Sequence, residues 1–185
     1  KLKVAGDVAA DLARLCAIAA VLDRSREPYF ASLDGNEQYE DMQGVVELWT
    51  RMQAEPRLAR LVGSILFIER PIRRQAALER PVAGIDKPVI IDESDDALDA
   101  FPRARALGYR GVSSKTCKGL YKSLLNAARC AEWNKLGSGP NYSAQKEFGP
   151  DPNYFLSGED LTIQAGLALQ QDTALVSLLG LTHLE

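Results

Sequence analysis

The sequence predicts an α/β fold in which helices cover a parallel sheet, and three observations support this prediction. Short apolar runs alternate with amphipathic helical stretches along all 185 residues. The apolar runs, such as SILFIE at 64–69 and PVIID at 88–92, lack the alternation of a sheet that has one face in water. Each run ends on a charged residue that a turn follows. Together these features are typical of a parallel sheet that is buried on both faces.

The first half of the chain predicts three strands and two long helices. The expected strands are 1–4, 27–34 and 64–69. A helix is expected over 7–24, where Asp7 is placed to cap its start. A second apolar stripe runs from Met42 to Met52 and ends before Pro56. A short helical piece should follow the third strand, through residues 75–80.

The second half continues the alternation. The expected strands are 88–92, 109–115 and 153–160, and residues 181–185 read as the start of one more. The expected helices are 97–108, 120–133 and 161–179. The first of them should be closed by Gly108 and kinked at Pro102. Residues 137–153 are rich in Gly, Ser, Asn and Pro, and predict a loop.

Two architectures fit this order of elements: a doubly wound sheet and a TIM-type (β/α)8 barrel. A complete barrel takes about 250 residues, and the chain supplies about seven strands. One further strand would be needed before residue 1. The chain starts abruptly at KLKV and stops at HLE directly after an apolar stretch, so we expect residues 1–185 to be a single barrel domain within a longer protein.

Composition excludes several classes of function. The net charge is −3, with 46% hydrophobic and 25% charged residues, which is the balance of an ordinary globular domain. No basic stripe points to nucleic acid, and neither a membrane-length apolar run nor a signal peptide is present. The cysteines, Cys16, Cys117 and Cys130, are odd in number and far apart. We therefore expect free thiols and a cytoplasmic location.

Charged residues terminate the predicted strands. Carboxylates follow three successive strands at Asp34, Glu69 and Asp92. In a barrel the carboxyl ends of all strands meet on the face that carries the active site. Three carboxylates meeting there could hold a hard divalent cation, and oxygen-only ligation suits Mg²⁺. The alternative is that these side chains are solvated helix caps.

Lysines accompany these carboxylates on other strands. Lys1 and Lys3 lie on the first strand, and Lys115 ends the strand over 109–115. A nearby cation and partial burial both lower the pKa of a lysine, which would make it a proton acceptor near neutral pH. The alternative is that each lysine is solvated.

Two familiar motifs are absent. The stretch DGNEQYEDMQGV begins like a calcium loop, but Tyr39 replaces the required Gly and Val45 the bidentate Glu. Neither GxGxxG nor GxxxxGK[ST] occurs, so no phosphate-binding loop is predicted.

The ordered motifs resemble the enolase superfamily, in its mandelate racemase/muconate lactonizing enzyme branch. They are KLKV at 1–4, LDGN at 33–36, IERP at 68–71, IIDES at 90–94 and VSSK at 112–115. Each single motif is weak, but the set occurs in the family's order, one per strand. The resemblance spans nearly the whole chain, without the family's N-terminal capping domain and first barrel strand.

The resemblance implies a role for each of these residues. Asp34, Glu69 and Asp92 would ligate Mg²⁺, and Lys3 and Lys115 would be acid/base groups on opposite faces of the substrate. Lys1 would help hold the substrate carboxylate, and Glu93 would lie close to a catalytic lysine. Asn36 and, without support from a motif, Glu159 are further candidates for substrate binding. The family's chemistry is removal of the proton α to a carboxylate, which gives an enediolate that the metal stabilises.

The sequence departs from the family at three places. Lys118 stands where the first Gly of a Gly-Gly pair is expected, which puts the local loop in question. His183, the single histidine, lies too late for a His–Asp dyad, so a two-lysine arrangement is preferred. The strand expected over 153–160, which ends in LSGED, matches no motif of the family. Ser157 or Glu159 could contact substrate, or Glu159 and Asp160 could simply open a helix.

Two functions from different classes follow. The first is an isomerase or lyase of a small-molecule carboxylate: a racemase or epimerase, a cycloisomerase, or a dehydratase. The alternative is a non-catalytic barrel that binds a small molecule or a partner at its charged rim. A doubly wound binding domain is a weaker third reading, since no phosphate motif supports it. Self-association into a homo-oligomer is left open.

Overall fold

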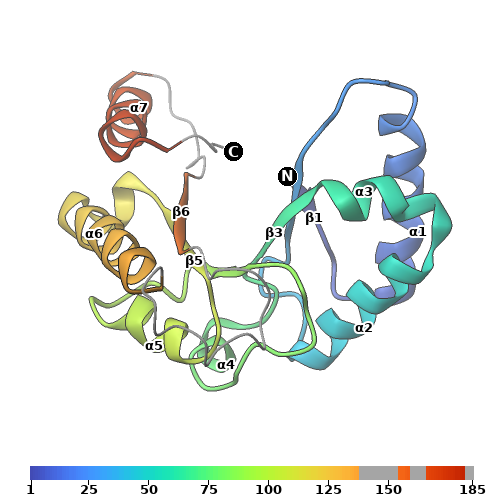
Figure 1. Cartoon of the computed structure of the whole chain (residues 1–185), viewed down its shortest axis with the longest axis horizontal. Helices are drawn as coiled ribbons and strands as arrows, with labels where there is room; N and C mark the ends of the chain where they lie inside the picture. The colour runs from blue at the N-terminus through green and yellow to red at the C-terminus, as the bar shows by residue number, and fades with distance from the viewer. Residues whose placement is uncertain (138–153, 159–165, 182–185) are drawn as a thin grey trace.

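The computed structural model describes residues 1–137, 154–158 and 166–181 (Figure 1). Its strands form one parallel sheet in sequence order, β1-β2-β3-β4-β5-β6. They are β1 (Leu2–Lys3), β2 (Ala31–Asp34), β3 (Ile65–Glu69), β4 (Val89–Ile91), β5 (Gly111–Ser114) and β6 (Phe155–Gly158). The order never reverses, as it would at the switch point of a doubly wound sheet.

The sheet curls. The rings of Phe67 on β3 and Phe155 on β6 have centroids 5.6 Å apart, although β4 and β5 separate these strands in the sheet. Such a contact requires the two strands to face each other across a concave surface. The described strands therefore form a six-stranded half-barrel with β1 and β6 at its edges, which agrees with a partial TIM-type barrel.

Helices lie around the outside of this half-barrel, with α1, α2 and α3 on one side and α5, α6 and α7 on the other (Figure 1). They are α1 (Val8–Leu22), α2 (Met42–Ala54), α3 (Ala59–Ser64), α4 (Arg74–Ala77), α5 (Ala100–Ala106), α6 (Leu120–Gly137) and α7 (Leu167–Leu179), with 3-10 turns η1 (Pro56–Leu58) and η2 (Thr116–Lys118). As predicted, Asp7 caps α1, accepting from the N–H groups of Ala9 and Ala10 at 3.0 and 2.9 Å.

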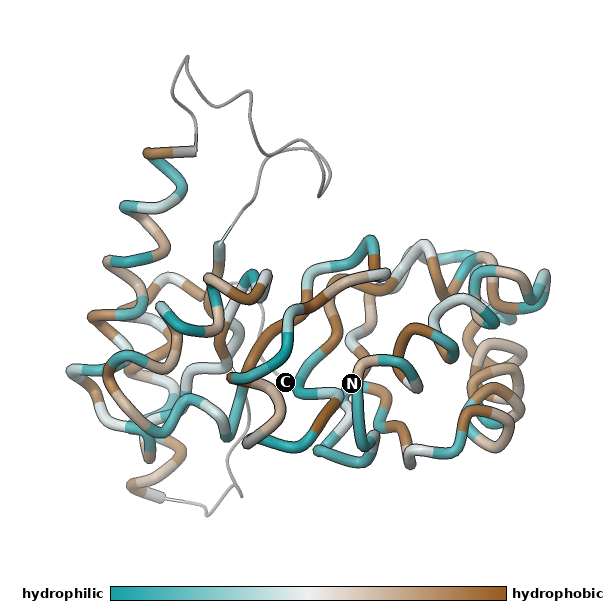
Figure 2. Tube along the Cα trace, turned by 90° about the horizontal axis from the view of Figure 1, so that it is seen from below, coloured by the Kyte–Doolittle hydropathy of each residue, from teal (hydrophilic) through white to brown (hydrophobic). Residues whose placement is uncertain are grey.

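The main core lies between the strands and these helices. It joins outward-facing strand residues to the helices' inner faces, among them Leu33, Ile68, Val89, Ile91, Val112, Leu15, Trp49, Met52 and Phe101. Figure 2 shows hydrophobic positions on the strands and recurring along the helices, with hydrophilic positions between them. No helix in the described ranges is both long and apolar enough to cross a bilayer.

Three details differ from the sequence-based expectations. The strand expected over 27–34 is formed only from Ala31, and the carbonyl of Glu27 accepts from Arg60 at 2.6 Å instead of pairing in the sheet. The helix α3 was not expected, since its two turns are too short to show a period. The helix expected over 97–108 starts at Ala100, so Pro102 falls in its first turn and no kink is needed.

Three further expectations lie outside the described residues. They are the loop expected over 137–153, of which only Gly137 is described, as the end of α6; the strand expected over 181–185, of which only Leu181 is described; and Glu159.

Candidate active site

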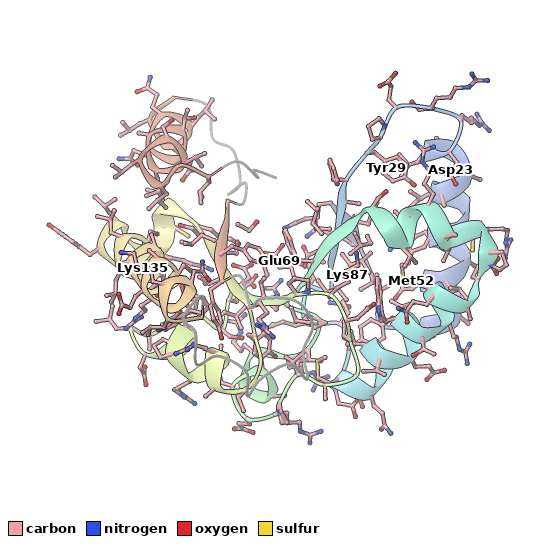
Figure 3. All side chains as sticks on the ribbon, in the orientation of Figure 1. Asp23, Tyr29, Met52, Glu69, Lys87 and Lys135 are labelled. Carbon is pink, nitrogen blue, oxygen red and sulfur yellow. The ribbon has the colours of Figure 1, made fainter. Side chains whose placement is uncertain are left out.

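Strand register places the predicted carboxylates on the inner face of the sheet. Lys3 pairs with Asp34, Asp34 with Glu69, and Glu69 with Ile90. Side chains alternate along a strand, so Asp92, two residues after Ile90, faces the same way as Glu69. Asp34, Glu69 and Asp92 are 2%, 1% and 2% exposed. In Figure 3, Glu69 lies near the middle of the molecule, between the two groups of helices.

Asp34 is held through both of its carboxylate oxygens. Its Oδ1 accepts the backbone N–H of Asn36 at 2.9 Å. Its Oδ2 lies 3.1 Å from Lys3 Nζ and 3.5 Å from Lys1 Nζ. Lys1 Nζ also lies 2.8 Å from Glu69 Oε2, so one ammonium group joins two of the three carboxylates. The first strand therefore supplies the positive charge that offsets these two buried anions.

Asp92 is held in the same two-sided way. Lys115 donates to Oδ2 at 2.8 Å, and Lys118 Nζ makes an ion contact with Oδ1 at 2.7 Å. Burial opposes ionisation of Asp92, but Lys118 and Lys115 outweigh it and hold its pKa below its ordinary value. Asp92 is therefore an anion fixed between two ammonium groups.

Lys118 is a residue of the site to which the sequence assigned no role. Its ammonium donates to the backbone carbonyls of Asp92 and Ser113, both at 2.8 Å, besides its contact with Oδ1. Burial lowers the pKa of Lys118, against the opposing effect of Asp92. Its place three residues after Lys115, on the turn that follows the strand, was the available signal.

Arg70 is a second residue of the site that the sequence did not identify. Its side chain is 7% exposed, and its Nη2 donates to Asn36 Oδ1 at 2.7 Å. Its Nη1 forms an ion pair with Glu93 and lies 3.8 Å from Asp92 Oδ2. Asn36 and Glu93, both expected at the substrate, are thus brought together by one guanidinium group.

The backbone at this rim is strained. Asn36, Glu37 and Arg70 have φ values of +42°, +61° and +34°, a region that side chains other than Gly seldom adopt. Strained residues of this kind persist where the surroundings hold them, often at functional sites. The loops after β2 and β3 also meet closely: a Cβ on Gly35 would lie 2.3 Å from Pro71 Cα.

The two predicted acid/base lysines approach the carboxylates from different strands. Lys3 lies on β1 and its side chain is 59% exposed, whereas Lys115 follows β5 and is 11% exposed. Asp34, Glu69 and Asp92 come from the strand ends between them. The structure thus brings Lys1, Lys3, Asp34, Glu69, Asp92 and Lys115 to one face of the sheet.

The donor set suits Mg²⁺ in kind, since it offers three buried carboxylates on one face and no sulfur or nitrogen ligand. The carboxylates are not preassembled: among the described residues, no three His, Cys, Asp or Glu side chains are close enough to share a metal ion. Ammonium and guanidinium groups contact them instead. Cation binding at this face therefore requires these side chains to rearrange, and the Mg²⁺ site stays a prediction.

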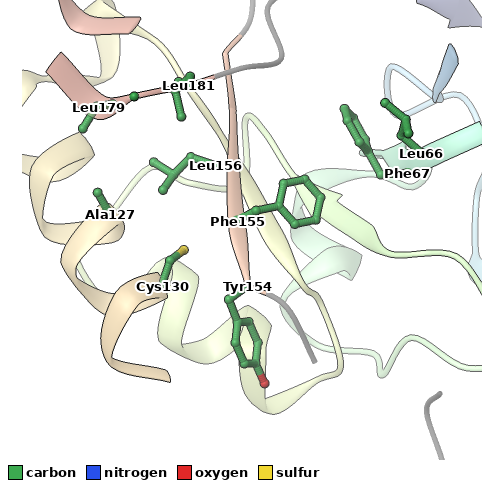
Figure 4. Close-up of a pocket in the computed structure, with 10 residues that line it drawn as sticks. Leu66, Phe67, Ala127, Cys130, Tyr154, Phe155, Leu156, Leu179 and Leu181 are labelled. Atoms are coloured by element: carbon green, nitrogen blue, oxygen red, sulfur yellow. The ribbon is translucent and has the colours of Figure 1, made fainter. Parts of the chain in front are cut away.

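A separate apolar pocket of about 470 Å³ lies beside β6, between α6 and the end of α7 (Figure 4). Its walls include Leu66, Phe67, Cys130, Phe155 and Leu181. Among the residues that the structure describes, no carboxylate, lysine or arginine lines it. The described ionisable side chains of the candidate site therefore lie on the charged face of the sheet and not in this pocket.

The sequence matches no family model and no curated protein. Among solved structures it is similar to an L-Ala-D/L-Glu epimerase, with a TM-score of 0.62 and 18% sequence identity. The similarity covers 99% of this chain and 46% of the epimerase chain, so this chain spans about half of that protein's length. At this identity the similarity shows the fold alone, and the protein shares the α/β fold of an epimerase.

Proposed function

We propose that the protein is a Mg²⁺-dependent isomerase or lyase that removes the proton α to the carboxylate of a small molecule. One observation carries the proposal: Lys3 and Lys115 approach from two separate strands a row of buried carboxylates at the carboxyl ends of the strands between them. The epimerase as structural neighbour favours a racemase or epimerase over a cycloisomerase or dehydratase.

Each residue has a proposed task. Lys115 accepts the α-proton on one face of the substrate, and Lys3 returns a proton on the other face; in the reverse direction they exchange roles. Asp34, Glu69 and Asp92 would hold Mg²⁺, which supplies positive charge to the substrate carboxylate as negative charge develops there. Lys1 and Arg70, with Asn36 and Glu93, orient the substrate at the rim.

The proposal extends to substrate and location. The structural neighbour is named an L-Ala-D/L-Glu epimerase, so dipeptides are the first candidate substrates to test. Sugar acids and dicarboxylates are the next. The free cysteines Cys16, Cys117 and Cys130 suit a reducing compartment, and we place the protein in the cytoplasm.

Isotope exchange tests the two-base mechanism. A base can exchange only the α-proton that points toward it, so Lys115→Ala should abolish turnover while Lys3 still incorporates deuterium from D₂O into one stereoisomer. Lys3→Ala should do the reverse with the other stereoisomer. The loss for each variant is expected to reach about 1,000-fold, or some 4 kcal/mol in the barrier.

The matched control is Lys135→Ala, which alters an exposed lysine near the end of α6 (Figure 3). Turnover and exchange should stay at the native rate in this variant. Near-native turnover of Lys115→Ala, or exchange without stereoselectivity in both variants, would contradict the mechanism. Binding of a carboxylate without any exchange would favour the non-catalytic barrel, whose charged rim holds a ligand unchanged.

A further inference from the structure

Lys118 contacts the site differently from the other cations. Its ammonium has three N–H donors, and three oxygens surround it: the carbonyls of Asp92 and Ser113, each at 2.8 Å, and Asp92 Oδ1 at 2.7 Å. The side chain is only 11% exposed. Lys118 is therefore a fixed, buried positive charge that ties the end of β5 to the residue after β4.

Asp34 and Asp92 are bound in a similar way, and the comparison shows what the contact between Lys118 and Asp92 does. In Asp34, Oδ1 is bound by the backbone N–H of Asn36, and Oδ2 faces the lysines of β1. In Asp92, Oδ1 is bound by Lys118, and Oδ2 faces Lys115. Each aspartate thus has one oxygen fixed by the protein and turns the other toward the shared face. The difference is that Asp92 is fixed by a full positive charge.

From this pattern we infer that Lys118 restricts Asp92 to one available oxygen and lowers the affinity of the site for a divalent cation. The inference rests on the proposed function, because it takes Asp92 as a metal ligand. Like charges a few ångströms apart in a poorly solvated place repel strongly. A cation arriving at Asp92 Oδ2 meets the field of Lys118, which cannot turn away without losing its three oxygens. Lys118 is a positioning residue in this scheme.

The orienting effect of Lys118 acts in the opposite direction, since a preoriented ligand binds more tightly than a free one. A neutral donor supplies the same orientation at Asp34 without adding charge. The difference between the two aspartates is therefore the charge, and charge interactions exceed those of a neutral hydrogen bond in such surroundings. We expect removal of the charge to strengthen cation binding.

The test compares neutral variants at two neighbouring lysines. Lys118→Met keeps the length of the stem without the charge, and Lys118→Gln also keeps an N–H donor. Lys122→Met is the control, because Lys122 is equally buried but pairs with Asp95, 3.4 Å away, rather than with Asp92. Titration calorimetry with MgCl₂, and with MnCl₂ as a second probe, gives the affinity of each full chain. Thermal unfolding without metal reports whether each variant is folded.

Both Lys118 variants should bind Mg²⁺ at least about tenfold more tightly than the native chain, as expected for removal of a nearby like charge, and Lys122→Met should match the native chain. If Lys118→Met does not fold, Lys118→Gln carries the test. Native or weaker affinity in the folded Lys118 variants overturns the inference and leaves the metal site standing. No binding of either cation by any chain overturns the inference together with the proposed metal site.

Discussion

The two faces of the same sheet differ in chemistry at the carboxyl ends of the strands. Outward-facing strand residues are apolar and join the helices in the main core: Leu33, Ile68, Val89, Ile91 and Val112. Inward-facing residues at the carboxyl ends are charged or polar: Lys3, Asp34, Glu69, Asp92 and Ser113. Neighbours such as Ile91 and Asp92 are thus both buried, in opposite surroundings.

This difference teaches that the outer face stabilises the fold, while the inner face gathers charged groups that must be paired. Apolar side chains gain free energy simply by leaving water. Buried charges lose hydration and persist only when they are paired, as Asp92 is with Lys115 and Lys118. Because side chains alternate, a slip of one residue would exchange the two faces. The register is specified because such a slip would move the apolar side chains away from the core.

The largest expected effect comes from breaking the outer face. Ile91→Ala removes a side chain that is 1% exposed within the main core, and should lower the free energy of unfolding by about 2–5 kcal/mol. Urea denaturation followed by circular dichroism measures this loss. Leu98→Ala is the control, because Leu98 is 61% exposed and its loss should change stability by less than about 0.5 kcal/mol. Equal losses in the two variants would contradict the assignment of the core.

An intermediate effect is expected on the inner face, where two nearby aspartates should respond with opposite signs. Asp92→Asn weakens two charged contacts and should cost about 1.5–3 kcal/mol at pH 7 without metal. Asp95 is also buried, and burial outweighs Lys118 and Lys122 to raise its pKa. Its ionised form is therefore disfavoured in the fold, and Asp95→Asn should leave stability unchanged or higher. Urea denaturation in EDTA compares the two variants.

The pH dependence of these two variants follows from the same shifts. The pKa of Asp92 is depressed in the fold, so its contribution is complete above the ordinary value of 3.8 and is lost as the pH falls through the folded pKa. The difference in free energy of unfolding between the native chain and Asp92→Asn should therefore shrink as the pH falls below 3.8. The pKa of Asp95 is raised, so the cost of its ionised form disappears as the pH falls toward 3.8. Any gain in free energy of unfolding in Asp95→Asn should therefore fade as the pH falls toward 3.8. If the free energy of unfolding of the two variants changed with pH in the same way, the opposite pKa shifts of Asp92 and Asp95 would be refuted.

The smallest expected effect concerns the contact between a helix and the inner face. Asp172 on α7 accepts both the hydroxyl and, at 3.3 Å, the N–H of Thr116, the residue after Lys115. Thr116→Val removes the hydroxyl donor and should cost about 1 kcal/mol. Thr116→Ser, which keeps the hydroxyl, should cost less, as differential scanning calorimetry can show. A larger loss with Ser than with Val would mean that the methyl group matters more than the hydrogen bond.

The sequence predicted the main features of both faces, because each depends on a local rule. Apolar runs identified the strands, and the residue that ended each run identified Asp34, Glu69, Asp92 and Lys115. In a parallel sheet those ends must meet at one edge, so the common face of these residues followed from the chain order. The alternation also limited the fold to two architectures, between which the strand order and the curl of the sheet decide.

What sequence reasoning missed depends on contacts that no pattern encodes. Arg70 contacts Glu93 and Asn36 from a backbone position with positive φ, which no sequence pattern indicates for an arginine. Lys118 enters the site because the 3-10 turn η2 folds it back onto the carbonyl of Ser113. The strand expected from residue 27 was too long, and Arg60, 33 residues further along the chain, binds the carbonyl of its first residue, Glu27.

The absence of a side chain at Gly35 joins two parts of the rim mechanically. Gly35 donates its N–H to the carbonyl of Glu69 at 2.9 Å and packs directly on the backbone of Pro71. The turns after β2 and β3 are therefore joined at this point by a backbone hydrogen bond and by direct packing. Asn36 and Arg70 lie one on each turn, so a side chain at position 35 would push the two turns apart and disturb the hydrogen bond between Arg70 and Asn36.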